Sequence, residues 1–166
     1  LYNSLHCHVR AKLGEKYGTD KVAQDEPIPA HLLGNMWAQA WGNIYDVVAP
    51  ENADPGYDVT ELLAKNNYDE LKMVKGAETF FTSMGFEPLP ETFYERSLFV
   101  KPKDRDVQCH ASAWNIDSKD DLRIKMCIQR TGEEFSVIHH ELGHNFYQRA
   151  YNKQPLFYQE SANDGF

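Results

Sequence analysis

The sequence is short of basic residues and of long apolar runs. Its 166 residues include 17 lysines and arginines against 25 aspartates and glutamates, which gives a net charge of −8 with neutral histidines. Nucleic-acid-binding domains usually carry a basic stripe, so this balance argues against a nucleic-acid partner. No apolar run approaches the roughly 18 residues that span a bilayer, and we expect no membrane contact within this stretch.

The sequence also lacks an initiator methionine, a recognisable signal peptide and an Asn-x-Ser/Thr glycosylation acceptor. It opens at Leu1, inside a helical pattern and with no capping residue ahead of it. We therefore expect a piece of a longer chain, in which a missing signal carries no information on localisation. Apolar residues are abundant: 42% of the residues are hydrophobic and 13% are aromatic. This content is typical of a globular protein.

The spacing of apolar residues predicts a mainly helical chain with one small hairpin. Two alternating segments, 107–114 and 122–128, predict strands, and the turn-forming residues between them favour an antiparallel pair. The run 32–48 is apolar on most sides and predicts a helix buried in a larger body. The other predicted helices span residues 5–17, 68–84, 91–97 and 133–151, and one more is predicted to start at Asp58. Gly18 follows the first of these helices, and Gly85 closes the helix over 68–84.

The last predicted helix contains the motif His140-Glu141-Leu-Gly-His144. Residues four apart lie on one helical face, so the two imidazoles can bind one ion while Glu141 points toward its bound water. Neutral imidazole suits zinc, which lowers the pKa of that water and polarises a carbonyl. Glu141 would be the general base. The alternative is a solvated helix face rich in histidine and glutamate.

A third zinc ligand is not evident from the motif alone. A metzincin needs glycine and histidine three and six places after His144, where this chain has Tyr147 and Ala150, so that class is excluded. Glu160 and Asp164 are the carboxylates that follow the motif. Each is either a ligand or an ordinary polar residue, whereas a catalytic zinc site usually has three protein ligands.

Four segments together resemble the angiotensin-converting enzyme, or peptidyl-dipeptidase A, family. They are Ile28–Gln39, Cys109–Trp114, His139–His144 and Glu160–Phe166. The resemblance runs along the whole chain. It implies a mainly α fold with a small antiparallel hairpin beside the active site, within a larger two-lobed helical peptidase. Residues 1–166 would be an internal fragment of a single peptidase catalytic domain that releases C-terminal dipeptides from oligopeptides.

The resemblance also implies roles for individual residues. His140 and His144 would bind zinc, with Glu141 as the general base. The substrate-binding residues would be His110, which bonds a substrate carbonyl, the backbone at Ala111 and Ala113, which holds the peptide as an added strand, and Gln39, which helps to hold the terminal carboxylate. Without the resemblance, His110 and Gln39 are better interpreted as buried polar residues.

Other functional groups of the family would lie outside this stretch. The third zinc ligand would be a glutamate two places beyond Phe166, and the ligands of a chloride ion also lie elsewhere in the family. Asn145-Phe146-Tyr147-Gln148 departs from the Ile-Gln-Tyr-Phe that is common in relatives. The alternative to an active zinc peptidase is a catalytically inactive relative that binds peptides or serves a structural role.

The three cysteines bear on the cellular compartment in which the protein acts. The family pairs the positions of Cys109 and Cys127, and such a cross-link would contribute about 3 kcal/mol through loop closure. The alternative is a reduced, buried pair. Cys7 is either a buried free thiol or the partner of a cysteine elsewhere. An extracellular or cell-surface ectodomain is therefore expected from the resemblance and the proposed disulfide.

Overall fold

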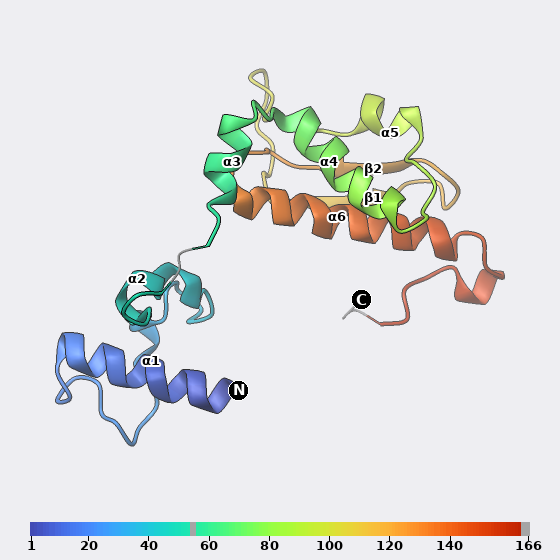
Figure 1. Cartoon of the computed structure of the whole chain (residues 1–166). Coiled ribbons are helices and arrows are strands. Elements are labelled where there is room, and N and C mark those ends of the chain that lie inside the picture. The colour runs from blue at the N-terminus through green and yellow to red at the C-terminus, as the bar shows by residue number, and fades with distance from the viewer. Residues whose placement is uncertain (54–55, 164–166) are drawn as a thin grey trace. The chain divides into compact units, whose positions relative to one another are not determined.

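The computed structural model describes residues 1–53 and 56–163, and the chain divides into two compact units, Leu1–Pro55 and Gly56–Phe166. Each unit is described by itself. Helices predominate, and the sheet among the described residues has two strands (Figure 1). None of the described helices combines the length and the apolar character that crossing a membrane requires.

The first unit is built on helix α1, Tyr2–Tyr17, which confirms the predicted first helix. It ends at Gly18, whose φ of 99° lies in the left-handed region that favours glycine. Short helical turns follow at Ala30–Leu32, Trp41–Ile44 and α2, Tyr45–Val48. The buried residues of this unit are Val9, Leu13, Val22, Ile28 and Leu33.

The prediction of one continuous helix over residues 32–48 is wrong. Gly34 has a φ of 88°, and the carbonyl of Ala40 occupies the space that a Cβ on Gly34 would need. Ala38 also has a positive φ, of 58°. Two left-handed residues only four positions apart cannot lie within one right-handed helix. Trp37 is 68% exposed, so this side chain is not buried within the unit.

Among its described residues the second unit has four α-helices and a short helical turn at Leu156–Tyr158, and local capping explains where three of the α-helices begin. The four are α3 (Val59–Lys65), α4 (Glu70–Ser83), α5 (Glu91–Arg96) and α6 (Gly132–Tyr151). The side chains of Asp58, Asp69 and Thr131 each accept a hydrogen bond from a backbone N–H in the first turn of α3, α4 and α6, as N-caps do. These helices confirm the predicted elements, with ends that differ by a few residues.

The predicted antiparallel hairpin is confirmed, but its strands are shorter than predicted. Strand β1 is Ser112–Asn115 and strand β2 is Leu122–Lys125, with Ala113 opposite Ile124. Beyond Lys125 the chain bonds residues 98–99 rather than β1: the Met126 N–H donates to the Leu98 carbonyl at 2.7 Å. The outer edge of β2 is therefore covered by this third segment.

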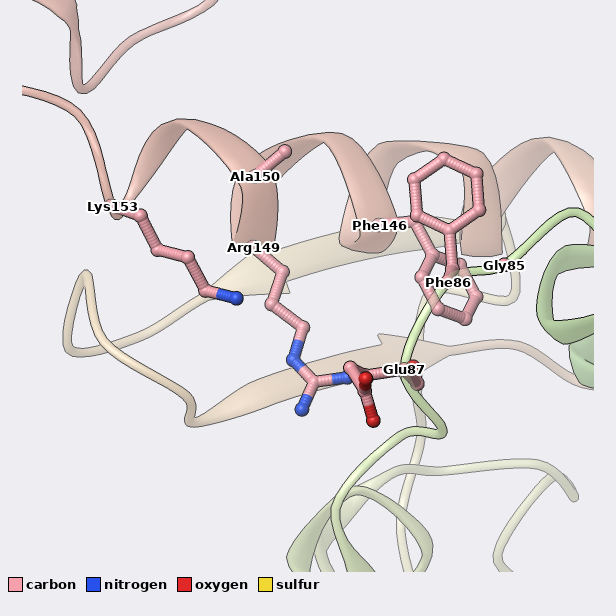
Figure 2. A pocket seen from close by; sticks show the side chains of 7 residues that line it. All are labelled: Gly85, Phe86, Glu87, Phe146, Arg149, Ala150 and Lys153. Atoms are coloured by element: carbon pink, nitrogen blue, oxygen red, sulfur yellow. The ribbon is translucent and has the colours of Figure 1, made fainter.

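The core of the second unit lies between α6, α4, α5 and the hairpin (Figure 1). Ile138, Leu142 and Phe146, which are spaced four apart, form the apolar face of α6. Arg149 joins the end of the same helix to the loop after α4, because its Nη1 donates to the carbonyls of Glu87 (2.9 Å) and Pro88 (2.6 Å). Figure 2 shows this arginine in a hollow of about 190 Å³. Its Nε also donates to Asp120 Oδ1 at 2.9 Å, so this side chain connects three segments of the unit.

Asp121, which precedes β2, ties the hairpin to α5. Its carboxylate accepts hydrogen bonds from Arg123 Nε and Nη2 (both 2.8 Å) and from Arg96 Nη1 (2.7 Å). These two guanidinium groups, Arg123 first, lower the pKa of Asp121 to about 2.

This pKa makes the stability of the second unit sensitive to acid. The folded pKa lies below the unfolded value of about 3.9, so the stabilisation is complete above about pH 5 and is lost as the pH falls toward 2. We expect the urea midpoint of the wild-type protein to fall more steeply between pH 4.5 and 2.5 than that of Asp121→Asn. Parallel curves for the two proteins would contradict this prediction.

Candidate active site

Helix α6 places the two histidines of the motif one turn apart on one face. The Nε2 atoms of His140 and His144 are 3.1 Å apart, and the two rings are nearly perpendicular, at 87°. His140 is exposed and His144 is half-buried. Both nitrogens are therefore directed to a single point beside the helix.

This donor pair fits a zinc ion. Two nitrogens that bind one tetrahedral zinc at about 2.0–2.1 Å lie about 3.3 Å from each other, close to the 3.1 Å observed. Unprotonated imidazole nitrogens at this separation repel unless a proton or a cation lies between them. Among residues 1–53 and 56–163, no group of three histidine, cysteine or acidic side chains is placed to hold a metal ion. Asp164 lies outside the described residues, and Glu160 is not gathered with the histidines.

Glu141 lies between the two histidines in sequence but is directed toward the interior. It is only 6% exposed and lines a cavity of about 350 Å³. Within the described chain, no side chain pairs with its carboxylate, so both oxygens are available to a group that enters the cavity. The other lining residues are Cys109, His110, Ala111, Glu134, Val137 and His140.

Glu134 is a cavity residue that the sequence analysis did not identify as functional. Its position in the first turn of α6 suggested only a favourable interaction with the helix dipole. Burial, and then the nearby Glu133, raise the pKa of its carboxyl group. The sequence spacing does indicate that Glu134 lies near Glu141, because residues seven apart lie on one helical face.

The backbone of β1 presents an unpaired edge. Ile116 and Asp121 form a hydrogen-bonded pair, since the Ile116 N–H donates to the Asp121 carbonyl at 3.0 Å. Such pairs alternate along an antiparallel ladder, so Ala113, three residues away, directs its N–H and C=O away from β2. Ile124, opposite Ala113, follows the same rule and accepts from the Leu98 N–H at 2.9 Å. The described residues leave the outer edge at Ala113 free to accept an added strand.

His110 and Ala111 lie just before β1 and line the cavity with Glu141. His110 is exposed, and its Nδ1 is 2.8 Å from the carbonyl oxygen of Ala111. A ring that donates from Nδ1 has a proton on Nε2 only as the imidazolium. In this structure Nδ1 of His110 is engaged with Ala111, whereas Nε2 has no hydrogen-bond partner among the described residues.

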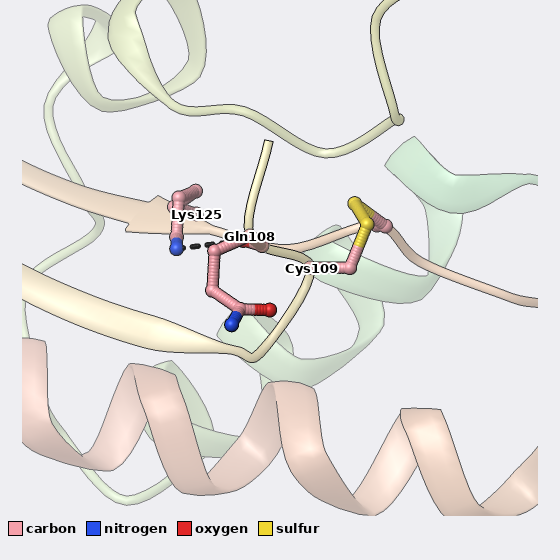
Figure 3. The surroundings of a disulfide bond; sticks show 4 residues. Gln108, Cys109 and Lys125 are labelled. Carbon is pink, nitrogen blue, oxygen red and sulfur yellow. Dashed lines mark hydrogen bonds between the residues drawn. A yellow bond between two sulfur atoms is a disulfide. The ribbon is translucent and has the colours of Figure 1, made fainter. Parts of the chain in front are cut away.

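Two contacts fix the segment that carries His110. Cys109 and Cys127 form a disulfide bond, and Lys125 Nζ donates to the Gln108 carbonyl at 2.7 Å, as Figure 3 shows. The alternative of a reduced pair is therefore wrong for this structure. Residues 108–109 are thus tied to the last residue of β2 and to the segment after it. These contacts hold the segment that leads into β1 in place beside α6.

The remaining predicted residues lie in the first unit. Gln39 is exposed and outside any helix, and its backbone N–H donates to Asn35 Oδ1 at 3.0 Å. The interpretation of Gln39 as a polar residue inside a buried helix is therefore wrong. Cys7 is free and exposed, so the alternative of a buried free thiol is also wrong, and a partner elsewhere stays a prediction.

A helix that presents two imidazoles and a buried carboxylate beside a free strand edge is an arrangement typical of metallopeptidases. The comparison with known families gives the same class: residues 1–166 match the peptidase M2 family, described as angiotensin-converting enzyme. The chain belongs to this family.

Individual relatives match over the full chain. It is 48% identical to angiotensin-converting enzyme of Bos taurus and 47% identical to that of Rattus norvegicus, in both cases over 100% of this chain and 13% of the relative. It is 44% identical to the enzyme of Haematobia irritans exigua, over 27% of that relative. The chain therefore spans between about one eighth and about one quarter of the length of these relatives.

Proposed function

We propose that the full protein is a zinc peptidase that releases C-terminal dipeptides from oligopeptides. The observation that carries this proposal is the convergence of the His140 and His144 Nε2 atoms, 3.1 Å apart, beside a cavity lined by Glu141. The third ligand is the glutamate expected two places after Phe166. Residues 1–166 are then part of a single catalytic domain.

Each residue of the site has a chemical task in this proposal. Zinc, when bound, lowers the pKa of a coordinated water toward about 7 and polarises the peptide carbonyl. Glu141 would take a proton from the attacking water as the water oxygen bonds the peptide carbonyl carbon, and would pass that proton to the amine as the C–N bond breaks. Its carboxylate is suited to this task, because it is buried beside the histidines and has no competing partner in the described chain.

The substrate lies along β1 in this proposal. The outward N–H and C=O groups at Ala113 and the segment at Ala111 bond the peptide backbone, as in other cases of strand addition, and His110 bonds a substrate carbonyl. Gln39 contributes to the binding of the terminal carboxylate. The protein acts outside the cell, where the Cys109–Cys127 bond is stable, and a chloride ion would be held by residues beyond this stretch.

A blocked tripeptide tests the proposed reaction. We expect the full-length protein to release the C-terminal dipeptide, and a chelator to abolish that release by removing the ion from His140 and His144. Addition of zinc to the chelated protein should restore it. Dipeptide release that persists after complete zinc removal would disprove the metal mechanism, and no release by the zinc-loaded protein would favour the inactive, peptide-binding relative.

A further inference from the structure

Helix α6 has a polar face of which the proposed reaction uses only the first residue. Glu141 begins it, and three amide residues follow at spacings of four, three and four: Asn145, Gln148 and Asn152. These spacings place all four on one side of the helix. The Asn145 side chain contacts Gln148 and the hairpin, and the Asn152 side chain contacts the hairpin, while the apolar face formed by Ile138, Leu142 and Phe146 packs into the core. We call Asn145, Gln148 and Asn152 the amide row.

Asn145 is the most buried member of the amide row, with 0% exposure. Its Nδ2 lies 3.1 Å from Gln148 Oε1, 3.3 Å from the Arg123 carbonyl and 3.4 Å from the Trp114 carbonyl. Trp114 and Arg123 are opposite residues of β1 and β2. One amide therefore reaches the backbone of both strands at one point of the ladder.

Asn152 makes a second attachment near the C-terminal end of α6. It forms a reciprocal pair with the Asn115 side chain, at 2.9 and 3.2 Å, and its Nδ2 also lies 3.0 Å from the Lys119 carbonyl. The end of β1 and the turn after it are thus held at a defined position along the helix.

The burial of Asn145 is unfavourable for stability by itself. Its Oδ1 is buried and has no hydrogen-bond partner among the described atoms, which carries a desolvation penalty that an apolar side chain would not incur. Apolar contacts, however, are non-directional, whereas hydrogen bonds depend strongly on distance and angle. The row therefore fixes the position of the hairpin along α6 more sharply than apolar packing would.

We propose that the amide row, and Asn145 above all, positions the substrate-binding edge of β1 relative to Glu141. This inference rests on the proposed function, since it concerns how a peptide held on β1 is aligned with the base. The same helix carries Glu141 and the amide row, and the same strand carries Ala113 and the Trp114 carbonyl. A displacement of about 1 Å between reacting groups can lower the rate by about 100-fold, so this alignment matters for catalysis.

The test is Asn145→Leu in the full-length protein, which removes the directional contacts and keeps a side chain of similar size. We expect an equal or higher midpoint of thermal unfolding, unchanged zinc content and faster amide exchange in residues 112–115. We expect kcat/KM for the blocked tripeptide to fall about tenfold, within the range set by misalignment of the reacting groups, mainly through kcat. Asn66→Leu is the control, because within the described part of the chain that side-chain amide bonds only the Leu62 carbonyl of the adjoining helix, at 2.8 Å.

Unchanged exchange in residues 112–115 together with unchanged kinetics would overturn the inference. A loss of activity matched by a lower unfolding midpoint would also overturn it, because that result marks a merely structural residue. Asn152→Ala is the second variant if Asn145→Leu does not fold. We expect faster amide exchange in residues 112–115 and a lower kcat/KM from it as well, both of smaller magnitude. If the wild-type protein cleaves no peptide, the proposed function fails, and the exchange measurement still decides the positioning role.

Discussion

Replacing Glu141 by Gln in the full-length protein is expected to lower kcat by about 100-fold to 10,000-fold, the range for loss of a general base. Gln has nearly the same shape but cannot take a proton from water. Because the side chain is 6% exposed and unpaired, the substitution breaks no ion pair. Zinc content and the unfolding midpoint should therefore stay unchanged, and KM should change only a few-fold.

Glu133→Gln is the matched control for this variant. Glu133 lies on the same helix and is exposed in its first turn, so its loss removes one negative charge without reaching the cavity. We expect wild-type kinetics from it. Retention of kcat by Glu141→Gln would exclude Glu141 as the base, whereas loss of zinc from that variant would indicate a role at the metal.

Local signals in the sequence account for most of the helices. Asp58 accepts from the Glu61 N–H at 3.1 Å and so begins α3, and Gly85, with a φ of 95°, follows α4. These signals involve neighbours along the chain, so they can be read without knowledge of the tertiary structure. The same is true of His140 and His144, whose convergence follows from a spacing of four on any helix.

The parts of the fold that depend on distant contacts could not be predicted in this way. The break at Gly34 depends on close approach by the Ala40 carbonyl, and nothing in the apolar pattern of 32–48 indicates it. The length of β2 depends on its pairing with Leu98. The order of residues in a sequence does not show which segment will cover an edge, and this is why the strands were predicted too long.

Some residues of the site can be predicted from the sequence itself, and others cannot. The motif on α6 was evident from the residues, but the meeting of His110 and Ala111 with Glu141 in one cavity was expected only from the family resemblance. Asn145 was noticed only as a departure from relatives. Its contacts with two strands 22 and 31 residues away become evident only in the folded chain. The role of Gln39 and the third zinc ligand remain predictions.

Replacing His144 by Ala in the full-length protein is expected to weaken zinc binding by more than about 100-fold, because loss of a supporting residue alone costs 10- to 100-fold. The ion would keep only His140 and the proposed downstream glutamate of its three protein ligands, so peptide hydrolysis should be lost together with the metal. Metal content after dialysis, measured with the rate of tripeptide cleavage, checks both expectations. Excess zinc should restore part of the activity if weak binding is the cause.

The neighbouring His139 provides a control with the same side chain on another face of α6. Its Nδ1 lies 2.7 Å from the Phe135 carbonyl, and its ring packs against Phe80 and Phe135. It is therefore occupied by the protein rather than directed at the ion. His139→Gln should lower the unfolding midpoint and leave zinc binding intact, whereas His144→Ala should weaken zinc binding, because the His144 ring points to the metal position. Equal zinc loss from both variants would mean that the helix itself, rather than the His140 and His144 pair, is what the substitutions disturb.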